Sequence, residues 1–203
     1  MPRLAKYDEG QILGAAAKLV AANGPGAATM TAIGAALGAP NGSIYHRFRS
    51  RDELLGRLWL SKARAFQDSW AAGLTQAEPL AAGLEAALSM PRVVRADIEG
   101  ARIMLLHRRE DFLSDAWPQE MKAEAERLGR QVKDTLSEMT RRLFGRDTTS
   151  ARRATAFATI DIPVSAVRRF VSEGGAPPAQ IDEMIACAYR AVIEQERGAA
   201  NGA

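Results

Sequence analysis

The sequence predicts an all-α protein, and three features of the chain lead to this prediction. Alanine, leucine, arginine and glutamate dominate the chain, and all four favour helices. No segment shows the strict alternation of apolar and polar residues that is typical of a half-buried strand. Apolar residues instead recur at three- and four-residue spacing, as at Ile12, Ala16 and Leu19, which is the spacing of one helix face.

The first 55 residues are expected to form a small domain of short helices. Thr29 is a candidate N-cap for the second helix, because its hydroxyl can accept from backbone amides that lack a partner. Gly38 is expected to end that helix, since glycine adopts the left-handed conformation that a sharp turn requires. Ser50 is the candidate N-cap of the fourth helix, with Asp52 and Glu53 in its first turn. The expected helices run over residues 8–22, 30–37, 41–48 and 51–72.

A larger helical domain is expected over residues 56–197, followed by a disordered tail over residues 198–203. Met90-Pro91 is expected to break a helix, and Ile162-Pro163 to kink or break another, because proline lacks the amide proton of the helix ladder. Further helices are expected over residues 80–89, 96–109, 117–144, 150–172 and 180–195.

Two short helices joined by a glycine turn, with a third helix upstream, are typical of a helix-turn-helix. In this motif the second short helix enters the major groove of double-stranded DNA. The segment from Pro40 to Arg51 carries three arginines, Arg47, Arg49 and Arg51, and no acidic residue. Such a cluster complements phosphates. A solvated basic turn explains the same charges equally well. The net charge of +3 adds only weak support for an anionic partner.

The N-terminal sequence also resembles the TetR (tetracycline-repressor) family of bacterial transcriptional regulators. The resemblance is close over about the first 55 residues and only architectural beyond them. The chain departs from the family at Gly34, where alanine is usual, and at Pro40, where a small polar residue is usual. The residues that carry the resemblance are Gly24, Thr29, Ile33, Leu37, Gly38, Gly42, Ile44, Tyr45, His46, Phe48 and Ser50 to Leu54.

The resemblance implies a homodimeric repressor that binds a palindromic DNA operator and is released by a small-molecule effector. Asn41, Ser43 and His46 are the candidates for base readout, because amide, hydroxyl and imidazole groups match the donors and acceptors on base edges. Gly42 has no side chain and would let the helix approach the DNA closely. Pro40 precedes these residues in the expected DNA-binding segment.

Four further residues are expected to contact phosphates, which position the protein on DNA without reading its sequence. The candidates are Thr29, Thr31, Tyr45 and Arg51. Thr29 is at least as well explained as a helix cap alone. The large apolar residues of the same segment are expected to form its core instead: Ile33, Leu37, Ile44 and Phe48.

The second domain is expected to bind the effector and to form the dimer. Its aromatic and methionine content favours an apolar or amphipathic ligand, although ordinary core packing explains most of these residues as well. The candidate ligand-binding residues are Trp59, Phe66, Trp70, Met104, His107, Phe112, Trp117, Met121 and Met139. The last two expected helices carry apolar stripes that would form a four-helix bundle with a second copy, or face the chain's own core. The candidate dimer residues are Phe157, Ile160, Val164, Val167, Val171, Ile181, Ile185, Ala188 and Val192.

Other classes of protein receive little support from the sequence. Motifs of serine hydrolases, P-loop proteins, dinucleotide-binding proteins and zinc peptidases are absent, so we expect no enzyme, cofactor or metal. An adaptor that bridges proteins without binding DNA remains the alternative. The chain shows no apolar run long enough for a membrane span and no secretory signal. With one cysteine, Cys187, we expect a cytoplasmic protein.

Overall fold

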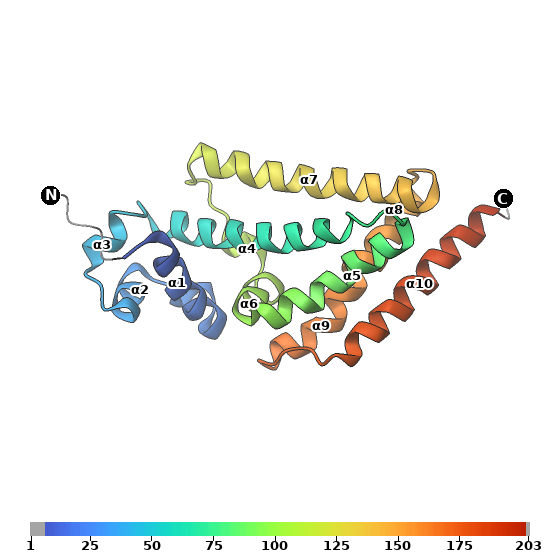
Figure 1. Cartoon of the computed structure of the whole chain (residues 1–203). Helices are drawn as coiled ribbons and strands as arrows, with labels where there is room; N and C mark the ends of the chain where they lie inside the picture. Colours follow the sequence, from blue (N-terminus) through green and yellow to red (C-terminus); the bar gives the residue numbers. More distant parts are fainter. Residues whose placement is uncertain (1–6, 202–203) are drawn as a thin grey trace. The chain divides into compact units, whose positions relative to one another are not determined.

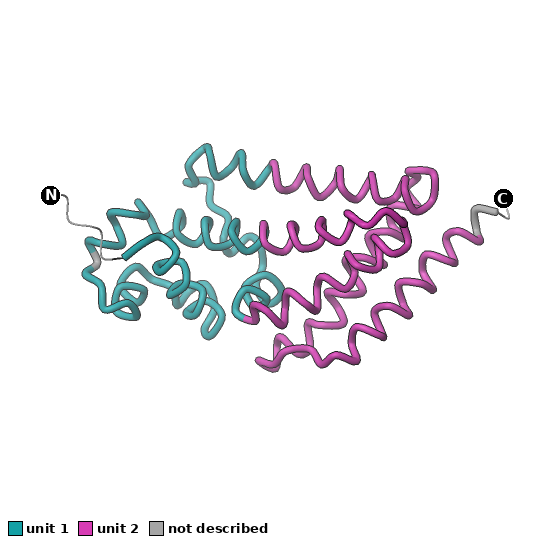
Figure 2. Tube along the Cα trace, in the orientation of Figure 1, with its two compact units in different colours: residues 1–63, 99–126 teal, residues 64–98, 127–203 magenta. Residues whose placement is uncertain are grey.

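The computed structural model describes residues 7–201, and within this range the chain is helical with no strand (Figure 1). The chain divides into two compact units (Figure 2). Unit 1 contains residues 1–63 and 99–126, and unit 2 contains residues 64–98 and 127–203. The chain passes between the units three times, within or at the start of three helices.

Unit 1 is built from the N-terminal helices and from the short helices near the middle of the chain. Asp8 caps the first helix with a capping box, in which Asp8 Oδ1 accepts from the Gln11 amide at 2.7 Å. The core contains Ile12, Val20, Ile33 and Ile103, all with no exposed surface. Its elements are α1 (Glu9–Asn23), a 3-10 turn (Pro25–Ala27), α2 (Met30–Leu37), α3 (Asn41–Tyr45), the first part of α4 (Arg51–Gly73), most of α6 (Ile98–Leu106), a 3-10 turn (Arg109–Asp111) and the start of α7 (Gln119–Phe144).

Unit 2 is a helical domain with its own apolar core. That core includes Met139, Leu143, Ile185, Tyr189 and Ile193. Beside the remaining parts of α4 and α7, its elements are α5 (Pro79–Ala96), α8 (Thr149–Ala156), a π-helical turn (Phe157–Asp161), α9 (Ile162–Ser172) and α10 (Gln180–Asn201).

Proline affects the two predicted break points differently. The prediction of a break at Met90-Pro91 is wrong, because α5 continues through a buried Pro91. This helix contacts both α9 and α10, and such packing offsets the loss of one backbone hydrogen bond. At Ile162-Pro163 the expected irregularity is present, since a π-helical turn directly precedes Ile162.

The C-terminal end and two short helices also differ from the expectation. The third helix ends at Tyr45 and not at Phe48. The last helix extends to Asn201, so residues 198–201 are helical where a disordered tail was predicted. The rest of that predicted tail, residues 202–203, lies outside the described residues. Helix α6 is shorter than predicted and ends at Leu106.

Candidate nucleic-acid interface

The turn between α2 and α3 has the geometry of a helix-turn-helix. Thr29 caps α2, since its Oγ1 accepts from the Ala32 amide at 3.1 Å. Gly38 follows α2 in the left-handed conformation, with φ of 61°. Its amide donates to the Ala35 carbonyl at 3.1 Å, which closes the helix end. Two helices are thereby joined by a tight turn, as the sequence predicted.

One side of α3 is fixed in the core and the other faces solvent. Ile44 and Phe48 have no exposed surface and belong to the core that also contains residues of α1 and α2. Gly42, Tyr45 and His46 are exposed, with 54% of Tyr45 accessible. The structure therefore brings these three predicted DNA contacts together on one exposed surface.

The other predicted DNA contacts lie on the same short segment or at the start of α2. Ser43 is half-buried, and Pro40 is exposed just before α3. Asn41 is the first residue of α3. Thr29 and Thr31 are exposed at the start of α2. Arg47 and Arg49 are exposed as well, so the loop after α3 presents two cations to solvent.

Arg51 has a structural role that the sequence did not predict. Its Nε donates to the Ala28 carbonyl at 3.1 Å, and one terminal nitrogen donates to the Pro25 carbonyl. The guanidinium thus joins the start of α4 to the 3-10 turn before α2. The phosphate contact of Arg51 stays a prediction. Arginine carries five N–H donors, so the donors that do not bond Ala28 and Pro25 would make that contact.

Glu53 connects the loop after α3 to the start of α4. Its carboxylate accepts from the Arg49 amide at 3.0 Å and pairs with Arg57 at 3.2 Å. The Glu53 amide donates to Ser50 Oγ at 3.1 Å, so Ser50 caps α4 as predicted. Glu53 is only 7% exposed, and these partners account for a buried carboxylate.

Most of the predicted effector residues of unit 1 take part in the packing of that unit. Phe112 is buried in the unit 1 core and contacts His107 edge to face, with ring centroids 6.4 Å apart. Trp117 donates from Nε1 to the Asp52 carbonyl at 3.2 Å. A Cβ at Gly56 would lie 2.4 Å from the Trp117 ring, so the glycine provides space for the indole. The predicted residues in unit 1 are Trp59, Met104, His107, Phe112, Trp117 and Met121.

Unit 2 holds the other predicted effector residues, Phe66, Trp70 and Met139. Met139 lines a cavity of about 430 Å³ between the end of α4 and α7. Trp70 is 8% exposed, and its Nε1 is buried with no hydrogen-bond partner. Gln67 Oε1, one turn earlier on α4, is in the same situation. Gln67 was not predicted from the sequence, because nothing in its sequence context separates it from a solvent-exposed glutamine.

The candidate dimer residues fall into two groups. Val167, Val171 and Ile185 are at most 1% exposed within the single chain, so they serve the core of unit 2 and are not available to a second copy. Phe157 is 50% exposed. The remaining candidates are half-buried: Ile160, Val164, Ile181, Ala188 and Val192.

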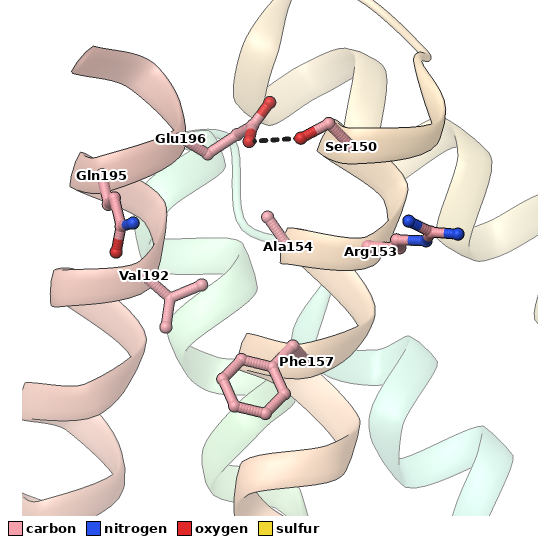
Figure 3. Close-up of a pocket in the computed structure, with 7 residues that line it drawn as sticks. All are labelled: Ser150, Arg153, Ala154, Phe157, Val192, Gln195 and Glu196. Atoms are coloured by element: carbon pink, nitrogen blue, oxygen red, sulfur yellow. Dashed lines mark hydrogen bonds between the residues drawn. The ribbon is translucent and has the colours of Figure 1, made fainter. Parts of the chain in front are cut away.

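A second cavity, of about 340 Å³, lies between α8 and α10 (Figure 3). Phe157 and Val192 form its apolar part, and Glu196 closes one end by accepting from Ser150 at 2.8 Å. Met184, 65% exposed on α10, was not among the predicted residues although it is next to Ile185 in the sequence. Its exposure adds a second large apolar side chain to the surface of these last helices.

The described residues lack two other kinds of site. Residues 7–201 contain no group of three or more histidine, cysteine, aspartate or glutamate side chains placed to hold a metal ion. No helix in this range is both long enough and apolar enough to cross a bilayer.

Comparison with known proteins agrees with the helix-turn-helix geometry. Residues 12–58 match the family model of "Bacterial regulatory proteins, tetR family". The N-terminal domain is that of the TetR family. The match covers α1 to α3 and the start of α4, which are the elements that carry the candidate DNA contacts. No curated protein matches the chain.

Solved structures of bacterial transcriptional regulators share the fold over nearly the whole chain. The FadR regulator of Bacillus subtilis, solved in complex with stearoyl-CoA, is 15% identical, with a TM-score of 0.69 over 92% of this chain and 98% of that one. A tetR-family regulatory protein of Rhodococcus RHA1 is 20% identical, with a TM-score of 0.69 over 94% and 97% of the two chains. KstR2 of Mycobacterium tuberculosis, a ketosteroid transcriptional regulator, is 17% identical, with a TM-score of 0.61 over 94% and 95%.

Proposed function

We propose that this protein is a transcriptional repressor that binds a palindromic operator as a homodimer and is released by a small apolar or amphipathic effector. The observation that carries the proposal is the exposed face of α3. Ile44 and Phe48 anchor this short helix in the core, while Gly42, Tyr45 and His46 remain accessible. A helix held in this way is suited to entering the major groove.

The proposed contacts on DNA fall into two classes. Asn41, Ser43 and His46 would read base edges, because their groups match the donors and acceptors of the major groove. Thr29, Thr31, Tyr45 and the free donors of Arg51 would bind phosphates, which fixes the position of the protein on the duplex. Arg47 and Arg49, both exposed, add positive charge beside this surface.

The proposed dimer uses the exposed apolar side chains of the last helices. Phe157 and Met184 are large apolar residues with half or more of their surface accessible. Val192 lines the cavity beside Phe157. A second copy would cover these side chains in a bundle of α8, α9 and α10 with their symmetry mates. The dimer would place two α3 helices on two half-sites, about 34–36 Å apart or a multiple of that distance.

The effector is proposed to act through α4. Residues 51–63 of this helix belong to unit 1 and residues 64–73 to unit 2, so one helix contributes to both. The FadR complex with stearoyl-CoA and the ketosteroid regulator KstR2 support an apolar or amphipathic effector for this fold. Such a ligand would lower DNA affinity by its preference for one conformation, typically about 1–3 kcal/mol.

Selection from a random DNA library tests the proposal without knowledge of the operator. The purified protein is expected to enrich a palindrome. Tyr45→Phe should weaken binding to all sequences, whereas His46→Ala should relax the preference at one position of each half-site. If the wild-type protein enriches no sequence in any screened effector condition, the proposal is wrong and the adaptor alternative is favoured.

A further inference from the structure

The residue at the start of the described part of the chain is bound to the turn of the helix-turn-helix. Tyr7 donates from its hydroxyl to the Gly38 carbonyl at 3.0 Å, although the two residues are 31 positions apart in the sequence. Gly38 is the left-handed residue between α2 and α3, shortly before the exposed Pro40. Asp8 caps α1 directly after Tyr7. Hydrogen bonds at two successive residues therefore fix the entry of the chain into α1 beside the turn that leads to α3.

The turn that Tyr7 contacts leaves space for a DNA backbone. Gly38, Pro40 and Gly42 are all exposed. A Cβ added at Gly38 or at Gly42 would meet no atom within 4 Å, so the protein itself does not fill the space at these positions. Glycine is typical of sites where another molecule closely approaches the backbone. A duplex that lies against α3 can therefore also lie close to the turn and to Tyr7.

The charge of the chain changes sign at Tyr7. The six residues before it, which we call the N-terminal arm, contain Arg3 and Lys6 and no acidic residue. Two acidic residues, Asp8 and Glu9, follow Tyr7 directly, and their charges oppose a phosphate near the start of α1. The N-terminal arm, and not the start of α1, thus complements an anionic partner.

The N-terminal arm is long enough to reach the groove next to the one that α3 enters. Six extended residues span about 20 Å. One turn of DNA is about 34 Å long and contains one major and one minor groove, so the centres of neighbouring grooves lie about 17 Å apart along the axis. The neighbouring groove is the minor groove, because α3 is proposed to occupy the major groove. A narrow minor groove, typical of A·T base pairs, attracts arginine and lysine side chains.

We propose that the N-terminal arm inserts Arg3 and Lys6 into the minor groove beside each half-site and favours A·T base pairs there, with Tyr7 as the residue that positions the arm. This proposal rests on the proposed function and adds a second element that reads the operator. Base pairs that α3 does not reach thereby contribute to specificity. The chemical difference that the arm detects is the N2 amino group of guanine, which a G·C pair exposes in the minor groove and an A·T pair lacks.

Three duplexes test the proposal by equilibrium binding. Each contains the half-sites recovered by the selection from a random library, and the flanking positions hold A·T, G·C or inosine·cytosine pairs. Inosine is guanosine without the N2 amino group, so its pair with cytosine keeps the major groove of G·C and has the minor groove of A·T. The wild-type protein is expected to bind the A·T and inosine·cytosine duplexes alike. It should bind the G·C duplex at least about 5-fold more weakly, the lower end for one unfavourable base pair.

Substitutions in the arm and a matched control assign this preference to its residues. Arg3→Ala and Lys6→Ala should each reduce the preference for A·T over G·C flanks, and the double substitution should abolish it. Tyr7→Phe removes only the hydroxyl that bonds Gly38 and should also reduce it. Lys18→Ala removes a cation from an exposed position of α1 in the same unit and should leave it unchanged. The ratio of the two affinities is compared, because loss of any cation near DNA weakens binding to all duplexes.

Several outcomes would overturn the proposal. One is a wild-type protein that binds the three duplexes alike, as contacts with phosphates alone would give. Another is an inosine·cytosine duplex that binds as weakly as the G·C duplex, which would place the contact in the major groove. A preference that survives in the double variant, or is unchanged in Tyr7→Phe, would also contradict it. Each of these results leaves the repressor proposal intact because the half-sites are still bound, whereas a selection that enriches no duplex removes both proposals.

Discussion

Glycine at the end of α4 shows how a single missing methyl group determines helix packing. A Cβ at Gly73 would lie 2.5 Å from the backbone nitrogen of Ala86 and 2.7 Å from its Cα. Backbone atoms of α5 cannot rotate away as a side chain can. Gly73→Ala is therefore expected to lower the free energy of unfolding by about 1–3 kcal/mol, measured by denaturant titration.

Gly129 is the matched control for that substitution. It lies exposed in α7, and a Cβ there would meet nothing within 4 Å. Gly129→Ala should stabilise the protein by about 0.5–1 kcal/mol, because alanine favours the helix and loses less backbone entropy. Equal effects of the two substitutions would contradict the packing described for Gly73.

Substitutions of Arg51 distinguish a structural role of this residue from a role in DNA binding. Because its guanidinium donates to the carbonyls of Ala28 and Pro25, Arg51→Ala is expected to lower the free energy of unfolding by about 1–2 kcal/mol. Arg51→Lys, which keeps the charge, should recover only part of this loss. A variant of unchanged stability whose DNA binding depends less steeply on salt would show that Arg51 acts on phosphate alone.

At the scale of the helices, the sequence predicted elements best where caps and turns have a local cause. Thr29, Gly38 and Ser50 are in the predicted cap and turn positions because each acts through its nearest backbone amides or its own φ angle. Pro91 shows the limit of this reasoning. Whether a helix continues through proline depends on the contacts of α5 with α9 and α10, which residues distant in sequence provide.

The junction between α7 and α8 depends on one carboxylate and therefore on pH. Asp147 accepts from Ser137 and from Arg152. The hydrogen bond from Ser137 is the main reason that the pKa of Asp147 lies below its ordinary value, and Arg152 lowers it further. Since the folded state has the lower pKa, this stabilisation is complete above about pH 4 and is lost as pH falls through the folded pKa.

Asp147→Asn tests this junction. The variant is expected to melt at a lower temperature than the wild-type protein at pH 7. The difference should shrink as pH falls below about 4, because the wild-type carboxyl then becomes protonated as well. Thermal melts from pH 7 down to acid give the comparison. A difference between the two proteins that stays constant over this range would show that the Asp147 charge is not involved.

At the scale of the whole molecule, the sequence predicted the helical fold and the helix-turn-helix but did not separate buried from exposed residues of the last helices. Val167 and Phe157 belong to the same predicted stripe, yet Val167 has no exposed surface and Phe157 is half exposed. Both are apolar residues at helical spacing, so their sequence context does not show which of them faces outward. Gln67 was missed for a similar reason, since its burial comes from the fold and not from its neighbours in sequence.

The proposed dimer predicts a clear effect of charge at Phe157. Phe157→Arg should give a monomer by sedimentation analysis at micromolar concentration, because a partner would have to bury the new cation. Leu113→Arg places the same charge at another exposed apolar residue, 36% accessible in unit 1, and should leave the dimer intact. If the Phe157→Arg protein remains dimeric, the dimer interface does not lie on the surface of α8 and α10.

The proposed function depends most on two α3 helices that read two half-sites, and footprinting on the selected DNA tests this directly. At low salt the wild-type protein is expected to protect two symmetric segments whose centres lie about 34–36 Å apart, or a multiple of that distance. Binding should fall steeply as salt is raised, because phosphate contacts release counterions. Protection of a single unsymmetric segment, or no protection at any salt concentration, would contradict the proposed function.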